Sequence, residues 1–184
     1  NMGVTPNGAG GFKAVEDTKL DDNYYATSRL YAGYGMGEIK ISDKIRVIGG
    51  VRYESYSQKL TVKYPTLDSV YLENTVNDLL PSVNFIYNMT EKLGIRLAYY
   101  KTLNRAEFRE LAGANWYEPE TRLSNAGNPD LVRCTIQNFD ARFEIYPGRG
   151  QLFTVSGFYK YFKNPIERYM YPGNAIQVYY KKIG

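Results

Sequence analysis

Few residues of this chain have a type that could do covalent or metal chemistry. The 184 residues include no histidine, which excludes a Ser-His-Asp triad and any metal site built on histidine. The one cysteine, Cys134, therefore has no histidine partner to activate it, and an inert thiol is the simplest interpretation. The sequence predicts no catalytic residue, no cofactor and no metal site, so we expect a protein that is not an enzyme.

Two pairs of acids could in principle serve glycoside hydrolysis, which needs two carboxylates. They are Glu118 with Glu120, and Asp140 with Glu144. In a strand, however, residues 140 and 144 lie on one face with Arg142 between them. That arrangement is typical of a charge ladder on a water-facing wall.

The residues best suited to contact a ligand lie in the segment 103–134. It contains Trp116, Tyr117, Asn125 and Asn128, a combination of aromatic rings and amides that can stack on and hydrogen-bond a sugar or a siderophore. Loops carry binding residues more often than strands do. The alternative is that Trp116 and Tyr117 only pack the loop onto its scaffold or anchor it at a rim.

The composition describes the scaffold that must position these residues. Aromatic residues make up 15% of the chain, with 19 tyrosines, and hydrophobic residues reach 43%. The mean hydropathy is nevertheless −0.46, which indicates strands with one apolar face and one polar face in contact with water. The net charge of +4 is scattered among acids and includes no basic run, so we expect no nucleic-acid partner. No apolar run approaches the roughly 18 residues of a membrane helix.

The hydrophobic period is two along most of the chain after residue 22. The segment 138–145 is the clearest example, because Phe139, Ala141, Phe143 and Ile145 alternate with Asn138, Asp140, Arg142 and Glu144. Similar alternation predicts strands around 46–54, 82–88, 93–99 and 153–161. A first strand at 25–41 is less regular, and its Gly33, Gly35 and Gly37 predict a bulge or close packing.

Short and long connections alternate between these strands. Tight turns are predicted at 43–44, 90–92 and 147–150, and long connectors at roughly 57–78, 103–134 and 164–174. A transmembrane barrel has this order, with short turns on one side and long loops on the other. The fold class is thus predicted to be all-β, an antiparallel up-and-down transmembrane β-barrel of which about seven strands are present. The alternative is a secreted or surface β-sandwich that binds glycans, whose closed core would contain Phe139, Phe143 and Ile145.

Three stretches resemble the TonB-dependent receptor family, especially the receptors of Bacteroidetes-type bacteria. They are Leu80–Phe85 with Tyr99–Leu111, then Gly127–Leu131 with the strand that follows, then Val155–Glu167. Within the first, residues 105–111 are expected to form a short helical turn. Family members usually continue the second stretch with Lys-Pro, whereas this chain has Val132-Arg133-Cys134.

The resemblance implies a 22-stranded barrel closed by a plug, in the outer membrane of a Gram-negative bacterium. It implies import of a small solute such as an oligosaccharide or a metal chelate. The implied partners are outer-membrane lipid, the energy-transducing TonB complex and a surface lipoprotein. Residues 1–184 are then expected to be a fragment of one barrel domain, with 1–22 as a loop, 23–184 as strands and loops, and the plug absent.

Overall fold

The computed structural model of the chain describes residues 23–62, 70–112, 115–118, 120, 123–171 and 177–182. The predicted loop 1–22 lies outside these residues. The described residues form strands and one short helix: β1 (Tyr24–Lys40), β2 (Ile45–Val62), β3 (Val70–Thr90), β4 (Leu93–Asn104), α1 (Phe108–Leu111), β5 (Asn115–Glu118), β6 (Leu123–Ala126), β7 (Cys134–Ile145), β8 (Phe153–Lys163), β9 (Ile166–Tyr171) and β10 (Gln177–Lys182).

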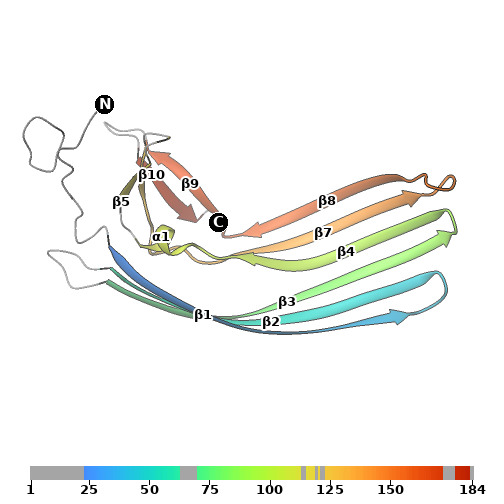
Figure 1. Ribbon diagram of the computed structural model, residues 1–184, viewed down its shortest axis with the longest axis horizontal. Helices are drawn as coiled ribbons and strands as arrows, with labels where there is room; N and C mark the ends of the chain where they lie inside the picture. Colours follow the sequence, from blue (N-terminus) through green and yellow to red (C-terminus); the bar gives the residue numbers. More distant parts are fainter. Residues whose placement is uncertain are drawn as a thin grey trace, which may run out of the picture.

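Six long strands form one sheet in the order β1-β2-β3-β4-β7-β8, and every neighbouring pair is antiparallel (Figure 1). The three short turns lie together at one end of this sheet, away from α1 (Figure 1). They occupy residues 41–44, 91–92 and 146–152, which confirms the predicted turns. Gly150 has φ of 73° in the last of them, a conformation that glycine adopts at little cost.

The register divides the sheet into two faces, and it shifts only at the turn end of β3, between Asn88 and Thr90. Directly paired residues share a face, so even-numbered side chains of all six strands lie on one face and odd-numbered ones on the other. We call these the inner and outer faces. Every buried residue of the six strands, as far as the structure describes them, is even-numbered and therefore on the inner face.

The polarity of these faces is the reverse of that in a soluble protein. On β7 the outer-face Phe139 and Phe143 are 44% and 36% exposed, whereas the inner-face Asn138 and Glu144 are only 2% and 6% exposed. The Asn138 side-chain amide donates to the Tyr100 carbonyl, and Glu144 accepts from the Tyr146 hydroxyl. A sandwich would place the phenylalanines in a closed core, and their exposure contradicts that alternative.

The outer face carries an apolar band on the half of the sheet nearer the turns. The band consists of the odd-numbered residues within 33–39 of β1, 47–53 of β2, 79–87 of β3, 93–99 of β4, 139–145 of β7 and 153–159 of β8. Six residues of strand span roughly 20 Å. That is close to the roughly 25 Å apolar band of a transmembrane barrel.

Beyond this band, β2 and β3 reverse their polarity. Their outer face becomes polar, and the Lys59 ammonium lies 2.7 Å from a Glu73 carboxylate oxygen. Their inner face becomes apolar, with Leu60 and Val62 almost fully buried. The predicted connector 57–78 is therefore wrong, since the strands continue to Val62 and resume at Val70.

The only hydrophobic core among the described residues lies on this reversed region. Leu60, Val62, Leu111, Ala112 and Leu131 form its buried centre. Helix α1 supplies Leu111, and the carboxylate of Glu110 accepts a hydrogen bond from the backbone nitrogen of Glu107 at the start of that helix. The predicted helical turn within 105–111 is thus confirmed.

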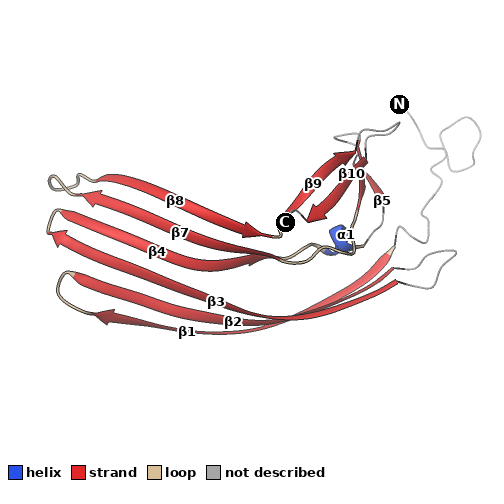
Figure 2. Ribbon diagram, turned by 180° about the vertical axis from the view of Figure 1, so that it is seen from behind, coloured by secondary structure: helices blue, strands red, loops and turns tan. Residues whose placement is uncertain are grey.

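A second sheet lies at the same end as α1 (Figure 2). Its strand order is β5-β6-β10-β9, with β6 and β10 parallel and the other pairs antiparallel. The predicted connector 164–174 is wrong, because β9 occupies most of it and only residues 164–165 separate β8 from β9. About seven barrel strands were expected, and the large sheet has six, while β9 and β10 belong to the second sheet.

The glycines of β1 do not have the predicted role. The pairing of β1 with β2 runs without a bulge from Tyr24 to Lys40. No described atom lies within 4 Å of a Cβ built on Gly33, Gly35 or Gly37, so they are not closely packed either. Among the described residues no helix is long and apolar enough to cross a membrane.

The exposed apolar band predicts that charge is tolerated on one face of the sheet only. In the full-length protein, Phe143→Arg should cost on the order of 2–4 kcal/mol at mid-bilayer and reduce the heat-modifiable, assembled barrel in outer-membrane fractions. Thr154→Arg is the matched control, since it places the same charge on the inner face opposite Glu144. Equal loss of assembly in both variants would contradict the assignment of the faces.

Candidate functional site

The connector between β4 and β7 carries the four predicted ligand-contact residues. Strands β5 and β6 form an antiparallel pair in which Trp116 lies opposite Asn125, and Tyr117 lies opposite Ser124. Trp116 and Asn125 therefore share one face of the second sheet, and Tyr117 points to the other. Asn128 follows β6 and lies in the turn that leads to β7.

The two asparagines have their side chains engaged within the chain. The side-chain oxygen of Asn125 accepts a hydrogen bond from the Arg168 guanidinium of β9 at 2.6 Å. The same guanidinium nitrogen lies 3.2 Å from a Glu118 carboxylate oxygen. The Asn128 side-chain oxygen accepts from the Asp130 backbone nitrogen at 2.9 Å. Both amides thus help to shape the connector.

The two aromatic residues differ in exposure. Trp116 is half-buried, and the Arg109 guanidinium of α1 lies 5.5 Å from its ring centroid, which ties β5 to the helix. Tyr117 is 60% exposed on the opposite face. Of the four predicted residues, Tyr117 has the ring most accessible to a ligand.

A cluster of buried charges, not predicted from the sequence, fixes this connector to the large sheet. Glu54 of β2 and Asp78 of β3 are direct cross-strand partners on the inner face, and both are more than nine-tenths buried. Two like charges in that position repel each other unless cations compensate them. Arg105, just after β4, lies 2.7 Å from Glu54 and 3.9 Å from Asp78, and Arg133, just before β7, lies 2.8 Å from Asp78.

Two further contacts complete this cluster. Arg52 lies 2.6 Å from Glu54, and the Arg105 guanidinium carbon lies 4.4 Å from the centroid of the Tyr56 ring. Arg105 and Arg133 stand at the two ends of the connector, so the acids of β2 and β3 hold both ends. No local pattern predicts this, because the pairing of residues 54 and 78 with 105 and 133 depends on the strand register.

Cys134 lies at the start of β7, outside the apolar band. It is buried, and burial raises the pKa of its thiol. Since the thiolate is the reactive form, both burial and the raised pKa oppose reaction. The acid pairs considered for hydrolysis do not form a site in the described residues: Glu118 pairs with Arg168, and Glu144 pairs with Arg96 and Arg142.

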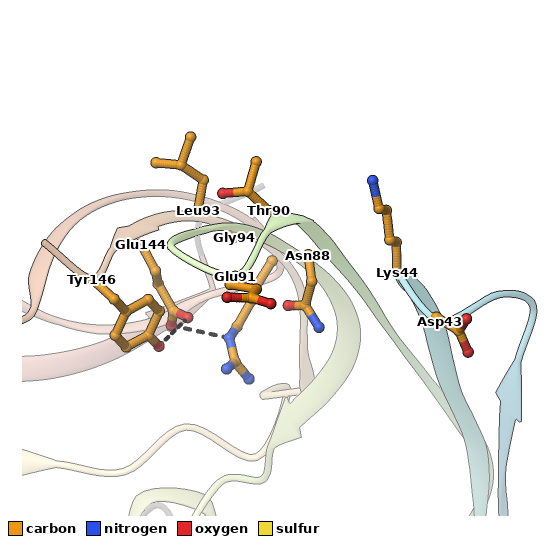
Figure 3. Close-up of a pocket in the computed structure, with 10 residues that line it drawn as sticks. Asp43, Lys44, Asn88, Thr90, Glu91, Leu93, Gly94, Glu144 and Tyr146 are labelled. Carbon is orange, nitrogen blue, oxygen red and sulfur yellow. Dashed lines mark hydrogen bonds and ion pairs between the residues drawn. The ribbon is translucent and has the colours of Figure 1, made fainter. Parts of the chain in front are cut away.

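At the other end of the inner face, near the turns, lies a polar cavity of about 390 Å³. Figure 3 shows Glu144 and Tyr146 on one side of it and Asn88, Thr90 and Glu91 on another. Glu144 accepts from the Tyr146 hydroxyl at 2.9 Å and pairs with the Arg96 guanidinium at 3.0 Å. The described residues include no cluster of acids or cysteine that could hold a metal ion.

The six-stranded sheet with its exposed apolar face agrees with a comparison of family models. A model described as TonB-dependent receptor-like, beta-barrel, matches residues 2–181. The chain belongs to this family. The resemblance seen in the sequence is thereby confirmed, and so is the fold, part of an antiparallel TonB-dependent receptor barrel. The family consists of outer-membrane transporters and not of enzymes, as the sequence predicted.

Solved structures similar to this receptor chain include a ferric enterobactin receptor, PfeA, in complex with BCV-L6. Another is a mutant of the receptor from Pseudomonas aeruginosa in complex with enterobactin. Both show 13% sequence identity and a TM-score of 0.47. The match covers 85% of this chain and 32% of theirs, so this chain spans about a third of their length. No curated protein matches it.

Loss of Arg105 should loosen the connector. Arg105→Ala leaves Glu54 and Asp78 facing each other with one guanidinium fewer, at a cost on the order of 2 kcal/mol. Amide hydrogen exchange in residues 105–112 and 123–134 of the full-length protein should then accelerate by about tenfold or more. Lys59→Ala removes an exposed ion pair of the same two strands and should leave this exchange unchanged. Equal exchange in both variants would refute the role of the cluster.

The buried thiol gives an independent test of the same packing. Cys134 in the native full-length protein should react with maleimide at least about tenfold more slowly than a cysteine introduced by Tyr117→Cys in a Cys134→Ala background. Arg105→Ala should raise the Cys134 rate. Fast labelling of Cys134 in the unaltered protein would show that the connector is not packed as described.

Proposed function

We propose that this chain forms part of the wall and of the external loops of an importer in the outer membrane of a Gram-negative bacterium. The observation that carries the proposal is the sheet itself, whose outer face has an exposed apolar band and whose inner face has the buried polar and charged side chains, in a chain of the TonB-dependent receptor family. In a bilayer, strands can cross only if every backbone group pairs with a neighbouring strand. Strands β2, β3, β4 and β7 have an antiparallel neighbour on both sides and provide that pairing, and β1 and β8 have one neighbour each.

The reversal of polarity beyond the apolar band supports an external position for α1 and the second sheet. Lys59 and Glu73 require water on the outer face there, while Leu60 and Val62 are covered by α1. Two adjacent strands that leave the hydrocarbon and enter water on the same side would have this pattern. The short turns then lie on the periplasmic side, as is usual for such barrels.

The proposed solute is an oligosaccharide or a metal chelate such as a ferric siderophore, and the proposed contacts include Trp116, Tyr117, Asn125 and Asn128. Tyr117 is the best placed of these. Tyr169 of β9 lies on the same face of the second sheet, and the two rings are 60% and 50% exposed. The two exposed rings, with Ser124 directly opposite Tyr117 on the neighbouring strand, offer stacking surface and a hydrogen-bond donor.

The remaining partners follow from the proposed location. The apolar band would contact outer-membrane lipid, and a plug joined to this barrel would receive energy from the TonB complex. A surface lipoprotein that covers the external loops is a further proposed partner. We propose no nucleic-acid partner, because the basic residues are interspersed with acids.

Uptake measurements test the importer directly. Deletion of the gene should abolish energy-dependent uptake of one solute from a panel of radiolabelled ferric siderophores and oligosaccharides. The intact gene should restore it, and a protonophore should stop it. Unchanged uptake across a panel that covers both chemical classes, with the protein absent from outer-membrane fractions, would contradict the proposed function.

The exposed tyrosines test the solute contact within that assay. The combined change Tyr117→Ala and Tyr169→Ala should weaken solute binding by about tenfold, since each aromatic contact contributes about 0.5–1.5 kcal/mol beyond its buried area. Tyr71→Ala is the control, because Tyr71 is equally exposed on the outer face of β3 at the same end of the molecule. A loss of binding that is as large in the control would show a general effect on the loops.

A further inference from the structure

A small cavity lies on the outer face of the large sheet, beyond the apolar band. It has a volume of about 240 Å³ and is lined by Thr27, Ser28 and Arg29 of β1 and by Ser57 and Lys59 of β2. Thr27 is directly opposite Lys59, and Arg29 is directly opposite Ser57, so these four residues are neighbours on that face. Pockets that enclose a whole drug-sized ligand measure roughly 300–1,000 Å³. This smaller cavity, which we call the outer cavity, therefore suits a single small group.

Two side chains of the outer cavity have hydrogen-bond donors that the sheet does not use. Arg29 is exposed, and no described carboxylate lies within 4 Å of its guanidinium nitrogens. The Ser57 hydroxyl oxygen accepts a hydrogen bond from the Thr75 hydroxyl at 3.1 Å. Because a hydroxyl group can accept and donate at the same time, the Ser57 proton remains available to a ligand.

The outer face of the six strands is positively charged beyond the apolar band. Its cations there are Arg29, Lys59, Lys101 and Lys163, and its one described acid is Glu73. Glu73 lies 2.7 Å from the Lys59 ammonium and compensates that cation. Four cations less one carboxylate leave an excess of three positive charges. This part of the outer face therefore attracts anions, and Arg29 is the cation of the outer cavity that no described acid compensates.

The distance of the outer cavity from the apolar band corresponds to the headgroup region of a bilayer. Tyr31 lies just beyond the band on the outer face and is 69% exposed, and tyrosine is enriched at this interface. Arg29 is four residues beyond Gly33, the last residue of the band on β1, which is roughly 13 Å of strand. At a strand tilt of about 45° this is roughly 9 Å along the membrane normal, and the headgroup layer is roughly 5–8 Å thick. The long side chain of Arg29 can reach back into that layer.

A phosphate group matches the donors of the outer cavity. Arginine presents a planar fork of N–H groups that can bind two phosphate oxygens at once. The Ser57 hydroxyl and the Lys59 ammonium can donate to a third oxygen, which a carboxylate does not have. In a lipid, the phosphate lies at the headgroup level, and the acyl chains extend into the hydrocarbon. A lipid phosphate in the cavity would therefore place its chains on the apolar band.

We propose that the outer cavity binds the phosphate group of a membrane lipid whose acyl chains lie along the apolar band. Arg29 binds two phosphate oxygens, and Ser57 and Lys59 donate to another. This site is separate from the exposed tyrosines of the second sheet that we propose for the imported solute. The inference rests on the proposed position of the band in the outer membrane. It requires no transport, so lipid binding and solute uptake can fail independently.

Native mass spectrometry of the purified full-length protein in detergent tests the site with dioctanoyl phosphatidic acid as the probe. Dioctanoylglycerol, which has the same chains but no phosphate, is the comparison lipid. The unaltered protein should bind phosphatidic acid about tenfold more tightly than dioctanoylglycerol, because only the former has a charged partner for Arg29. Arg29→Gln should weaken the binding of phosphatidic acid by about tenfold, since a two-point contact to phosphate is lost. The binding of dioctanoylglycerol should not change in this variant, which shows that the barrel is intact.

Lys163→Gln is the matched control, because it removes a cation of the same outer face on β8, outside the outer cavity. It should leave the binding of phosphatidic acid unchanged. An equal loss in both variants would overturn the site, because it would show a general attraction to the charged face. Equal binding of the two lipids by the unaltered protein would overturn the recognition of phosphate. Displacement of phosphatidic acid by inorganic phosphate at the same concentration would show a site for a soluble anion and would overturn the lipid as its ligand.

Discussion

The alternation of side chains in a β-strand is the constraint on which the rest of this structure depends. Because the six strands keep one register up to the shift between Asn88 and Thr90 at the end of β3, one parity of residue numbers defines one face of the sheet. Over the half nearer the turns, the odd positions form the apolar band, and the even positions of β2, β3, β4 and β7 are mostly polar and include every buried residue described there. A slip of one residue in any strand would move its charges into the apolar band. The same alternation thus positions the membrane surface, the charged wall and the connector.

The buried charge cluster lies between the apolar band and the ends of β2 and β3, where the polarity of the two faces is reversed. Glu54 and Asp78 are the last acids of the inner face before β2 and β3 turn apolar on that side, and Arg105 and Arg133 come from the connector. Buried ion pairs of this kind add little net stability, because desolvation of the charges offsets their attraction. Their geometry is nevertheless demanding, so they define where the connector begins and ends. With both ends held, α1 can cover the apolar inner face, and β5 and β6 can present Tyr117.

The sequence was sufficient for those features that depend on neighbouring residues. The turns at 43–44, 90–92 and 147–150 and the alternation around Phe139 and Phe143 are local patterns, and the structure confirms them. The outer ends of β2 and β3 were missed because Ser57, Lys59 and Glu73 are polar on the face that had been apolar, so the segment resembled a loop. The second sheet was missed because β6 pairs in parallel with β10, about 50 residues further along the chain. The charge cluster was missed for a similar reason, since it depends on the strand register.

A scan of β2 with nitroxide spin labels at positions 47–61 of the full-length protein in lipid vesicles tests the two-faced sheet most directly. Relaxation by oxygen reports contact with hydrocarbon, and relaxation by a water-soluble nickel chelate reports contact with water. The structure predicts oxygen accessibility at positions 47, 49, 51 and 53, and a change to nickel accessibility at 55, 57 and 59, with 58 and 60 shielded from both. Nickel accessibility at the odd positions 47–53, or no change beyond Glu54, would contradict the assignment of the apolar band to the bilayer and of the strand ends to water.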